Sequence, residues 1–132
     1  MAVAAGPLVW LLIGLWGLAP AGNGGGLDAR SLLLVGLVYP WLEEMAFRGA
    51  LQGGLSRWRA LRRGCGGITV ANFITSGVFV AAHLFAYTVP WALAVFFPSL
   101  VFGYFRDRYH SILPSAVLHM FYNTGLLVLV SN

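Results

Sequence analysis

Five apolar segments make up most of this 132-residue chain, and only short polar loops separate them. A helix of about 20 apolar residues is long enough to cross the hydrocarbon core of a bilayer. The segments cover residues 2–19, 27–51, 68–87, 91–105 and 112–130. This pattern predicts an all-α, polytopic transmembrane helix bundle of about five spans, with residues 1–132 forming a single domain.

The composition excludes a soluble protein of this size. Charged residues make up 9% of the chain, whereas a water-facing globular protein has about 25%. The net charge of +4 comes from arginines, and in a soluble protein such a basic balance would suggest nucleic acid. Here the arginines lie between the apolar segments, at the depth of lipid phosphates. We therefore expect the lipid bilayer, and no nucleic acid, as the partner.

The positions of the arginines predict how the bundle lies in the membrane. Arg57, Arg59, Arg62 and Arg63 follow the second segment, and Arg106 and Arg108 follow the fourth. Arg30, at the start of the second segment, is the single arginine at the opposite end of the helices. Because cytoplasmic loops carry an excess of arginine, we expect a cytoplasmic N-terminus and an external C-terminus.

The first segment has a second interpretation. Residues 19–21 (Ala-Pro-Ala) resemble a signal-peptide cleavage site, so residues 1–21 could be removed. A signal peptide also needs a positively charged start, which this segment lacks, so we interpret it as a retained helix. The single Cys65 excludes an internal disulfide and a cysteine-based metal cluster.

Beyond Asp28 and Arg30 at its start, the second segment carries three charged residues in its interior, at Glu43, Glu44 and Arg48. Each costs about 2.5–3.5 kcal/mol at the centre of a membrane helix, so they must pair or face the bundle interior. Glu44 and Arg48 are four residues apart and can form an ion pair on one helix face. Glu43 is rotated by about 100° from Glu44. Its side chain can therefore face a cavity and act as a general base. A purely structural ion pair between Glu44 and Arg48 would not explain the presence of Glu43.

Two histidines lie within later segments, at His83 and His119. His119 and Asn123 are one helical turn apart, so both side chains can address a single atom. Taken alone, an intramembrane histidine is more often a hydrogen bond between helices than a catalyst. We interpret Asn72 as such an interhelical bond, and His110, in a loop beside arginine, as interfacial.

Together these polar residues form an ordered set of motifs over residues 40–123. The set resembles the CPBP family, the CAAX proteases and bacteriocin-processing enzymes also called Abi, which includes the type II CAAX prenyl endopeptidase. The three motifs are Glu43-Glu44-x-x-x-Arg48, Phe79-x-x-x-His83 and His119-x-x-x-Asn123.

The resemblance implies an intramembrane endopeptidase, a multi-pass protein of the prokaryotic inner membrane. Its substrate would be a membrane-embedded or lipid-anchored protein or peptide, with a C-terminal sorting or CAAX-like signal. Because the chain is short, a second copy or a partner would complete the cavity wall. The resemblance implies three pairs of site residues: Glu43 and His83 to activate water, His119 and Asn123 to stabilise the oxyanion, and Glu44 with Arg48 to organise the others.

The sequence leaves the metal question and two rival functions open. Glu43, His83 and His119 would also be an acceptable zinc set with an open position. No His-Glu-x-x-His motif supports zinc, so we favour a metal-free, glutamate-type protease without a cofactor. The rivals are a non-catalytic bacteriocin-immunity protein and a proton or cation path through the buried charges. A transporter would usually show repeated broken helices, which this sequence lacks.

Overall fold

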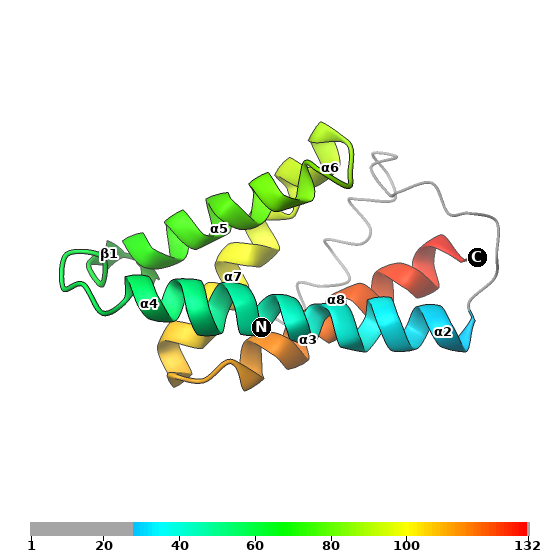
Figure 1. The fold of residues 1–132 in the computed structure, drawn as a ribbon, viewed down its shortest axis with the longest axis horizontal. Coiled ribbons are helices and arrows are strands. Elements are labelled where there is room, and N and C mark those ends of the chain that lie inside the picture. Colours follow the sequence, from blue (N-terminus) through cyan, green and yellow to red (C-terminus); the bar gives the residue numbers. More distant parts are fainter. Residues whose placement is uncertain (1–27, 132) are drawn as a thin grey trace.

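The computed structural model describes residues 28–131, which begin with one long helical rod (Figure 1). Asp28 caps its start by accepting a hydrogen bond from the Ser31 backbone N–H. Two stretches of the rod have π-helical hydrogen bonding. The consecutive parts are α2 (Ala29–Ser31), η1 (Leu32–Val38), α3 (Tyr39–Glu44), η2 (Met45–Gln52) and α4 (Gly53–Leu55).

A loop and a short β-hairpin connect the rod to the remaining helices. The hairpin pairs β1 (Gly64–Cys65) with β2 (Ile68–Thr69), a small departure from the predicted all-α fold. Its turn uses Gly66 and Gly67, both at positive φ, where a residue with a Cβ would be strained. The helices that follow are α5 (Val70–His83), α6 (Val89–Ala94), α7 (Phe96–Tyr109) and α8 (Leu113–Val130).

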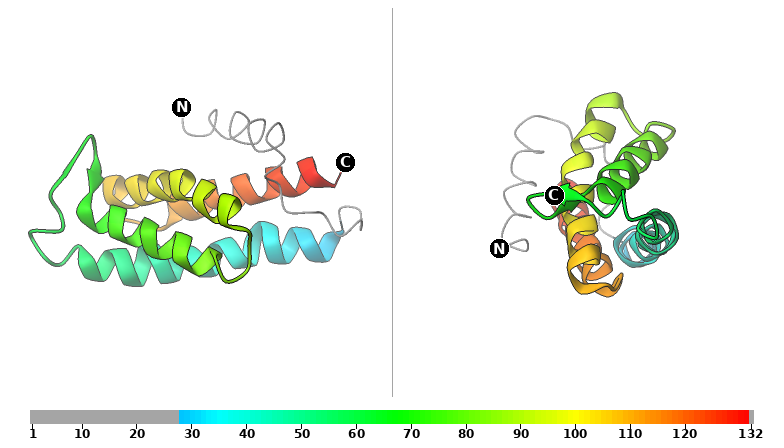
Figure 2. Two further views of the ribbon diagram at one scale, coloured as in Figure 1. Left: turned by 90° about the horizontal axis from the view of Figure 1, so that it is seen from above. Right: turned by 90° about the vertical axis from the view of Figure 1, so that its left-hand side faces the viewer.

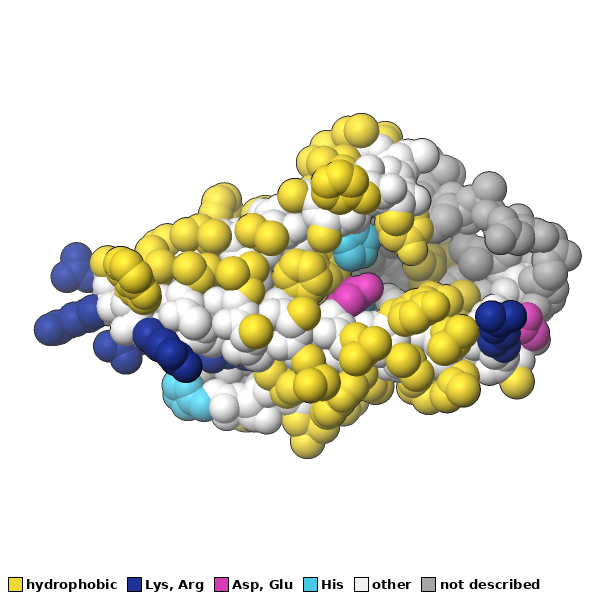
Figure 3. All heavy atoms as spheres, in the orientation of Figure 1, with side chains coloured by type: hydrophobic (Ala, Val, Ile, Leu, Met, Phe, Trp, Pro, Cys, Tyr) yellow, Lys and Arg dark blue, Asp and Glu magenta, His cyan; other side chains and the backbone are white. Residues whose placement is uncertain are grey.

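The rod, α5, α7 and α8 alternate in direction along the long axis of the molecule (Figures 1 and 2). Both arginine-bearing loops consequently lie at one end, and basic side chains gather there on the surface (Figure 3). This arrangement confirms that the two loops share one side of the bundle. At this end Asp107 accepts hydrogen bonds from Thr69 (2.7 Å) and Arg106 (2.8 Å), which ties α7 to the start of α5.

The helices agree with the predicted apolar segments, but they do not confirm the predicted number of spans. Among residues 28–131, one stretch, Val89–Tyr109, is long and apolar enough to cross a membrane, while α5 and α8 are apolar but shorter. The fourth predicted segment is two helices, because Pro98 has no N–H to donate to the carbonyl of Ala94. The predicted first segment, residues 2–19, lies outside the described residues, so five spans are not confirmed.

The bundle is polar inside and apolar outside. Its buried side chains are as often polar as apolar, while large apolar side chains are exposed along the helices (Figure 3). A soluble domain shows the opposite distribution. The buried polar residues are Glu44, Arg48, Gln52, Asn72, Thr75, Ser76, Ser99, Ser115 and His119.

Candidate active site

The ion pair predicted between Glu44 and Arg48 is present at the centre of the bundle. Both side chains are fully buried, and Arg48 Nε lies 3.7 Å from Glu44 Oε2. Among residues 28–131, neither of these two atoms has a hydrogen-bond partner. The guanidinium instead donates to the Ser99 carbonyl (2.8 Å), the Ser99 hydroxyl (2.5 Å) and Gln52 Oε1 (3.2 Å). Arg48 is therefore anchored on α7 and presents its charge to Glu44 without a direct hydrogen bond.

His119, on α8, lies between the two glutamates of the rod. Its Nδ1 is 3.1 Å from Glu44 Oε1, and its Nε2 is 3.7 Å from Glu43 Oε2. An ionised carboxylate can only accept a hydrogen bond, so His119 Nδ1 donates to Glu44. The Glu43 side chain is 32% exposed, whereas that of Glu44 is 0% exposed. Glu43 is therefore the carboxylate that a substrate or a water molecule can reach.

His83 approaches the same region from the end of α5. Its Nδ1 lies 2.9 Å from the Phe79 carbonyl oxygen, which can only accept, so Nδ1 donates and Nε2 is left as the acceptor nitrogen of the neutral ring. The imidazole packs between the rings of Phe79 (4.3 Å) and Tyr87 (5.6 Å). Glu43 interacts electrostatically with both His83 and His119, and an acidic side chain and a histidine flank a hollow in Figure 3.

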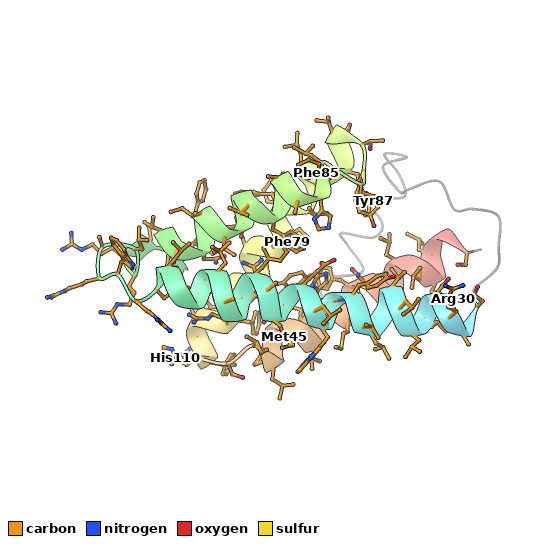
Figure 4. The ribbon with its side chains drawn as sticks, viewed as in Figure 1. Arg30, Met45, Phe79, Phe85, Tyr87 and His110 are labelled. Carbon is orange, nitrogen blue, oxygen red and sulfur yellow. The ribbon has the colours of Figure 1, made fainter. Side chains whose placement is uncertain are left out.

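Aromatic rings surround the two histidines. Phe79, which lies between α5 and the rod (Figure 4), is 5.9 Å from the ring of His119 and also contacts His83. Phe102 of α7 stacks on His119 at 4.6 Å. These ring contacts fix the planes of both imidazoles.

The amide of Asn123 hydrogen-bonds to the backbone of the rod and not to the glutamates that His119 contacts. Its Nδ2 donates to the Val35 carbonyl at 3.1 Å. The Tyr39 N–H bonds to Leu34, five residues back, and Pro40 has no N–H, so Val35 has no donor within the helix. In the structure, therefore, His119 and Asn123 contact separate groups, although we expected both side chains to contact a single atom.

The remaining polar residues lie where the sequence predicted. Asn72 donates to the Leu100 carbonyl at 2.9 Å and so links α5 to α7. His110 ends α7 with an exposed side chain and a φ of 52°. Cys65 is a free, exposed cysteine in the hairpin.

Sequence analysis missed several residues that contact the catalytic candidates directly, including Tyr87, which packs on His83. Ser99 and Gln52 bind Arg48, and Phe102 stacks on His119. Gln52 follows Arg48 by one turn, which was a usable signal for a shared face. Ser99 and Phe102 lie in an apolar segment without a motif, so the sequence carried no signal for them.

Within residues 28–131, no group of three or more histidine, cysteine, aspartate or glutamate side chains is arranged to hold a metal ion. Glu43, His83 and His119 share a region but do not form a ligand cluster.

Comparison with known proteins gives one result. The family described as type II CAAX prenyl endopeptidase Rce1-like matches residues 26–125, a range that includes all three motifs. No curated protein and no solved structure matches significantly. Members of the matched family are integral membrane proteases that are not known to need a cofactor. Because the match covers most of the chain, the protein belongs to the type II CAAX prenyl endopeptidase Rce1-like family.

Proposed function

We propose that this protein is an intramembrane endopeptidase of the glutamate type, with Glu43 as its general base. The difference between the two glutamates carries this proposal. Glu44 is fully buried and occupied by Arg48 and His119, whereas the Glu43 side chain is 32% exposed and 3.7 Å from an imidazole. Glu43 is therefore the carboxylate that can take a proton from water and later return it to the leaving amine.

The two histidines have complementary roles in this mechanism. His83, with Nδ1 occupied by the Phe79 carbonyl, uses its acceptor nitrogen Nε2 to hold the attacking water beside Glu43. His119, when protonated on both nitrogens, donates from Nε2 to the oxyanion of the tetrahedral intermediate. Asn123 has a second amide N–H beyond the one given to Val35, and we assign that N–H to the same oxyanion.

The family supports a membrane-associated peptide as substrate, and we propose a C-terminal sorting or CAAX-like signal. We also propose a multi-pass protein of about five spans in a prokaryotic inner membrane. A second copy of the chain would complete the wall of the catalytic hollow.

Cleavage by the reconstituted protein tests the assignment of the base. Proteoliposomes would be given a farnesylated CAAX peptide and a lipid-anchored peptide carrying a bacterial C-terminal sorting signal. Glu43→Gln and His83→Ala should abolish cleavage, because one removes the base and the other the water ligand. His110→Ala is the matched control and should cleave like the wild type, since His110 is an exposed residue at the end of α7. Equal cleavage by Glu43→Gln and the wild type would exclude Glu43 as the base.

The same proteoliposomes separate the rival functions. Proton or cation flux without proteolysis would support an ion path, and neither flux nor cleavage would support an immunity-type protein. A chelator should leave cleavage unchanged. Loss of cleavage that zinc restores would instead assign Glu43, His83 and His119 to a metal.

A further inference from the structure

One face of the rod carries three fully buried polar side chains, spaced four residues apart. They are Glu44, Arg48 and Gln52. Two α7 residues, Ser99 and Gly103, accept hydrogen bonds from this face and are also four residues apart. The rod and α7 are therefore joined by two polar steps, one between Arg48 and Ser99 and one between Gln52 and Gly103.

Both the oxygen and the nitrogen of the Gln52 side-chain amide form hydrogen bonds. Its Oε1 accepts from Arg48 at 3.2 Å, and its Nε2 donates to the Gly103 carbonyl at 3.0 Å. Ser99 accepts twice from the other side of the guanidinium, through its carbonyl and its hydroxyl. Three hydrogen bonds thus point the guanidinium toward α7 and Gln52, and none of them goes to Glu44.

This anchoring matters because arginine and carboxylate groups favour a close, two-pronged contact. In the structure they are kept at 3.7 Å, and the other oxygen of Glu44 bonds to His119 at 3.1 Å. A released Arg48 would move onto Glu44 and compete with His119 for the carboxylate. We propose that Gln52 and Ser99 are positioning residues that hold Arg48 back, so that Glu44 fixes the orientation and tautomer of His119.

Nitrogen NMR of the histidine side chains tests this proposal without a substrate. The chain has three histidines, so protein labelled with 15N-histidine and held in detergent micelles gives a spectrum that single His→Gln variants can assign. In the wild type the Nδ1 nitrogen of His119 should appear protonated, because Glu44 holds that proton. In Gln52→Leu and Ser99→Ala its nitrogen resonances should move toward those of a free imidazole that exchanges between tautomers. Those of His83 and His110 should stay in place.

Two matched controls distinguish positioning from general loosening of the bundle. Asn72→Leu removes a buried amide that also donates to an α7 carbonyl, and Ser76→Ala removes a buried hydroxyl that bonds to Asn72. Neither residue contacts Arg48 through a hydrogen bond, so both variants should keep the wild-type His119 spectrum. Ser99→Thr keeps the hydroxyl acceptor and should restore the signal that Ser99→Ala loses.

The results separate this inference from the proposed function on which it rests. An unchanged His119 spectrum in Ser99→Ala and Gln52→Leu, or an equal change in Asn72→Leu, would overturn the positioning role whether or not the protein cleaves peptides. If Gln52→Leu does not fold, Ser99→Ala decides alone, since it removes one oxygen. Where a peptide is cleaved, Gln52→Leu should lower kcat about tenfold at unchanged KM, the effect of one lost hydrogen bond to a charged group. A change in KM alone would contradict a role in orienting His119.

Discussion

At the scale of single residues, Asn123 shows how one side chain serves both the fold and the site. Pro40 removes the N–H that would have reached Val35, and the Tyr39 N–H is already bonded to Leu34. A carbonyl without a donor is costly inside a membrane because no water can replace the missing bond. The amide of Asn123 supplies that donor at 3.1 Å and so joins α8 to the rod beside the catalytic candidates.

This dependence predicts a non-additive pair of substitutions. Asn123→Ala should lower the free energy of unfolding by about 1–3 kcal/mol, the cost of an unsatisfied buried polar group. The loss should be smaller in a Pro40→Ala background, because that substitution restores a backbone N–H near Val35. Unfolding of the single and double variants in mixed detergent micelles measures the coupling. Equal losses in both backgrounds would show that Asn123 does not replace the missing donor.

The contacts of the catalytic candidates could be predicted from the sequence where both partners lie on the same helix. The spacing of Glu44 and Arg48 predicts their ion pair, and the structure confirms it. The acceptors for Arg48 could not be predicted, because two of its three hydrogen bonds go to Ser99, 51 residues away. One of those acceptors is a backbone carbonyl, a group that every residue carries and that leaves no mark in a sequence.

At the scale of helices, the close approach of α5 and α7 depends on a glycine. A methyl group at Gly103 would overlap the Asn72 side chain, which donates to the neighbouring Leu100 carbonyl. The helical ranges followed from the apolar pattern. The π-helical stretches did not, because they depend on backbone hydrogen bonds that composition does not specify.

Alanine substitutions at two glycines should therefore differ in their effect on stability. Gly103→Ala should destabilise the bundle by about 1–3 kcal/mol, because overpacking forces Asn72 and α5 away from α7. Gly77→Ala is the matched control in α5, where an added methyl group meets no atom within 4 Å, and it should change stability by less than about 1 kcal/mol. Thermal unfolding in the same detergent compares the two. A stable Gly103→Ala variant would mean that α5 and α7 have room to adjust.

At the scale of the whole molecule, charge is distributed unevenly along the long axis. The loops that carry Arg57–Arg63 and Arg106–Arg108 lie at one end, and Arg30 lies at the other (Figures 3 and 4). The composition predicted this membrane-facing architecture, since a chain with 9% charged residues cannot cover itself with polar groups. The number of spans could not be fixed in the same way, because buried polar residues shorten the apolar runs by which spans are recognised.

The asymmetry predicts which end faces the cytoplasm. Cys65 is exposed beside the arginine-rich loop and is the single cysteine of the chain. A membrane-impermeant maleimide should label it in inverted vesicles but not in intact spheroplasts. A Cys65→Ser, Ser131→Cys variant carries its thiol at the end of α8 and should give the opposite result. Labelling of Cys65 from outside would reverse the predicted topology.

The long chain separation between Arg48 and its anchors has a consequence for biosynthesis. When the rod first leaves the ribosome, Arg48 has only Glu44 and Gln52 of its own helix as partners, because Ser99 is made 51 residues later. A helix bearing two acids and an arginine is not stable alone in lipid. The rod must therefore remain beside the translocon, or at the membrane surface, until α7 has been synthesised. Premature termination before α7 should leave a fragment that quality-control proteases remove.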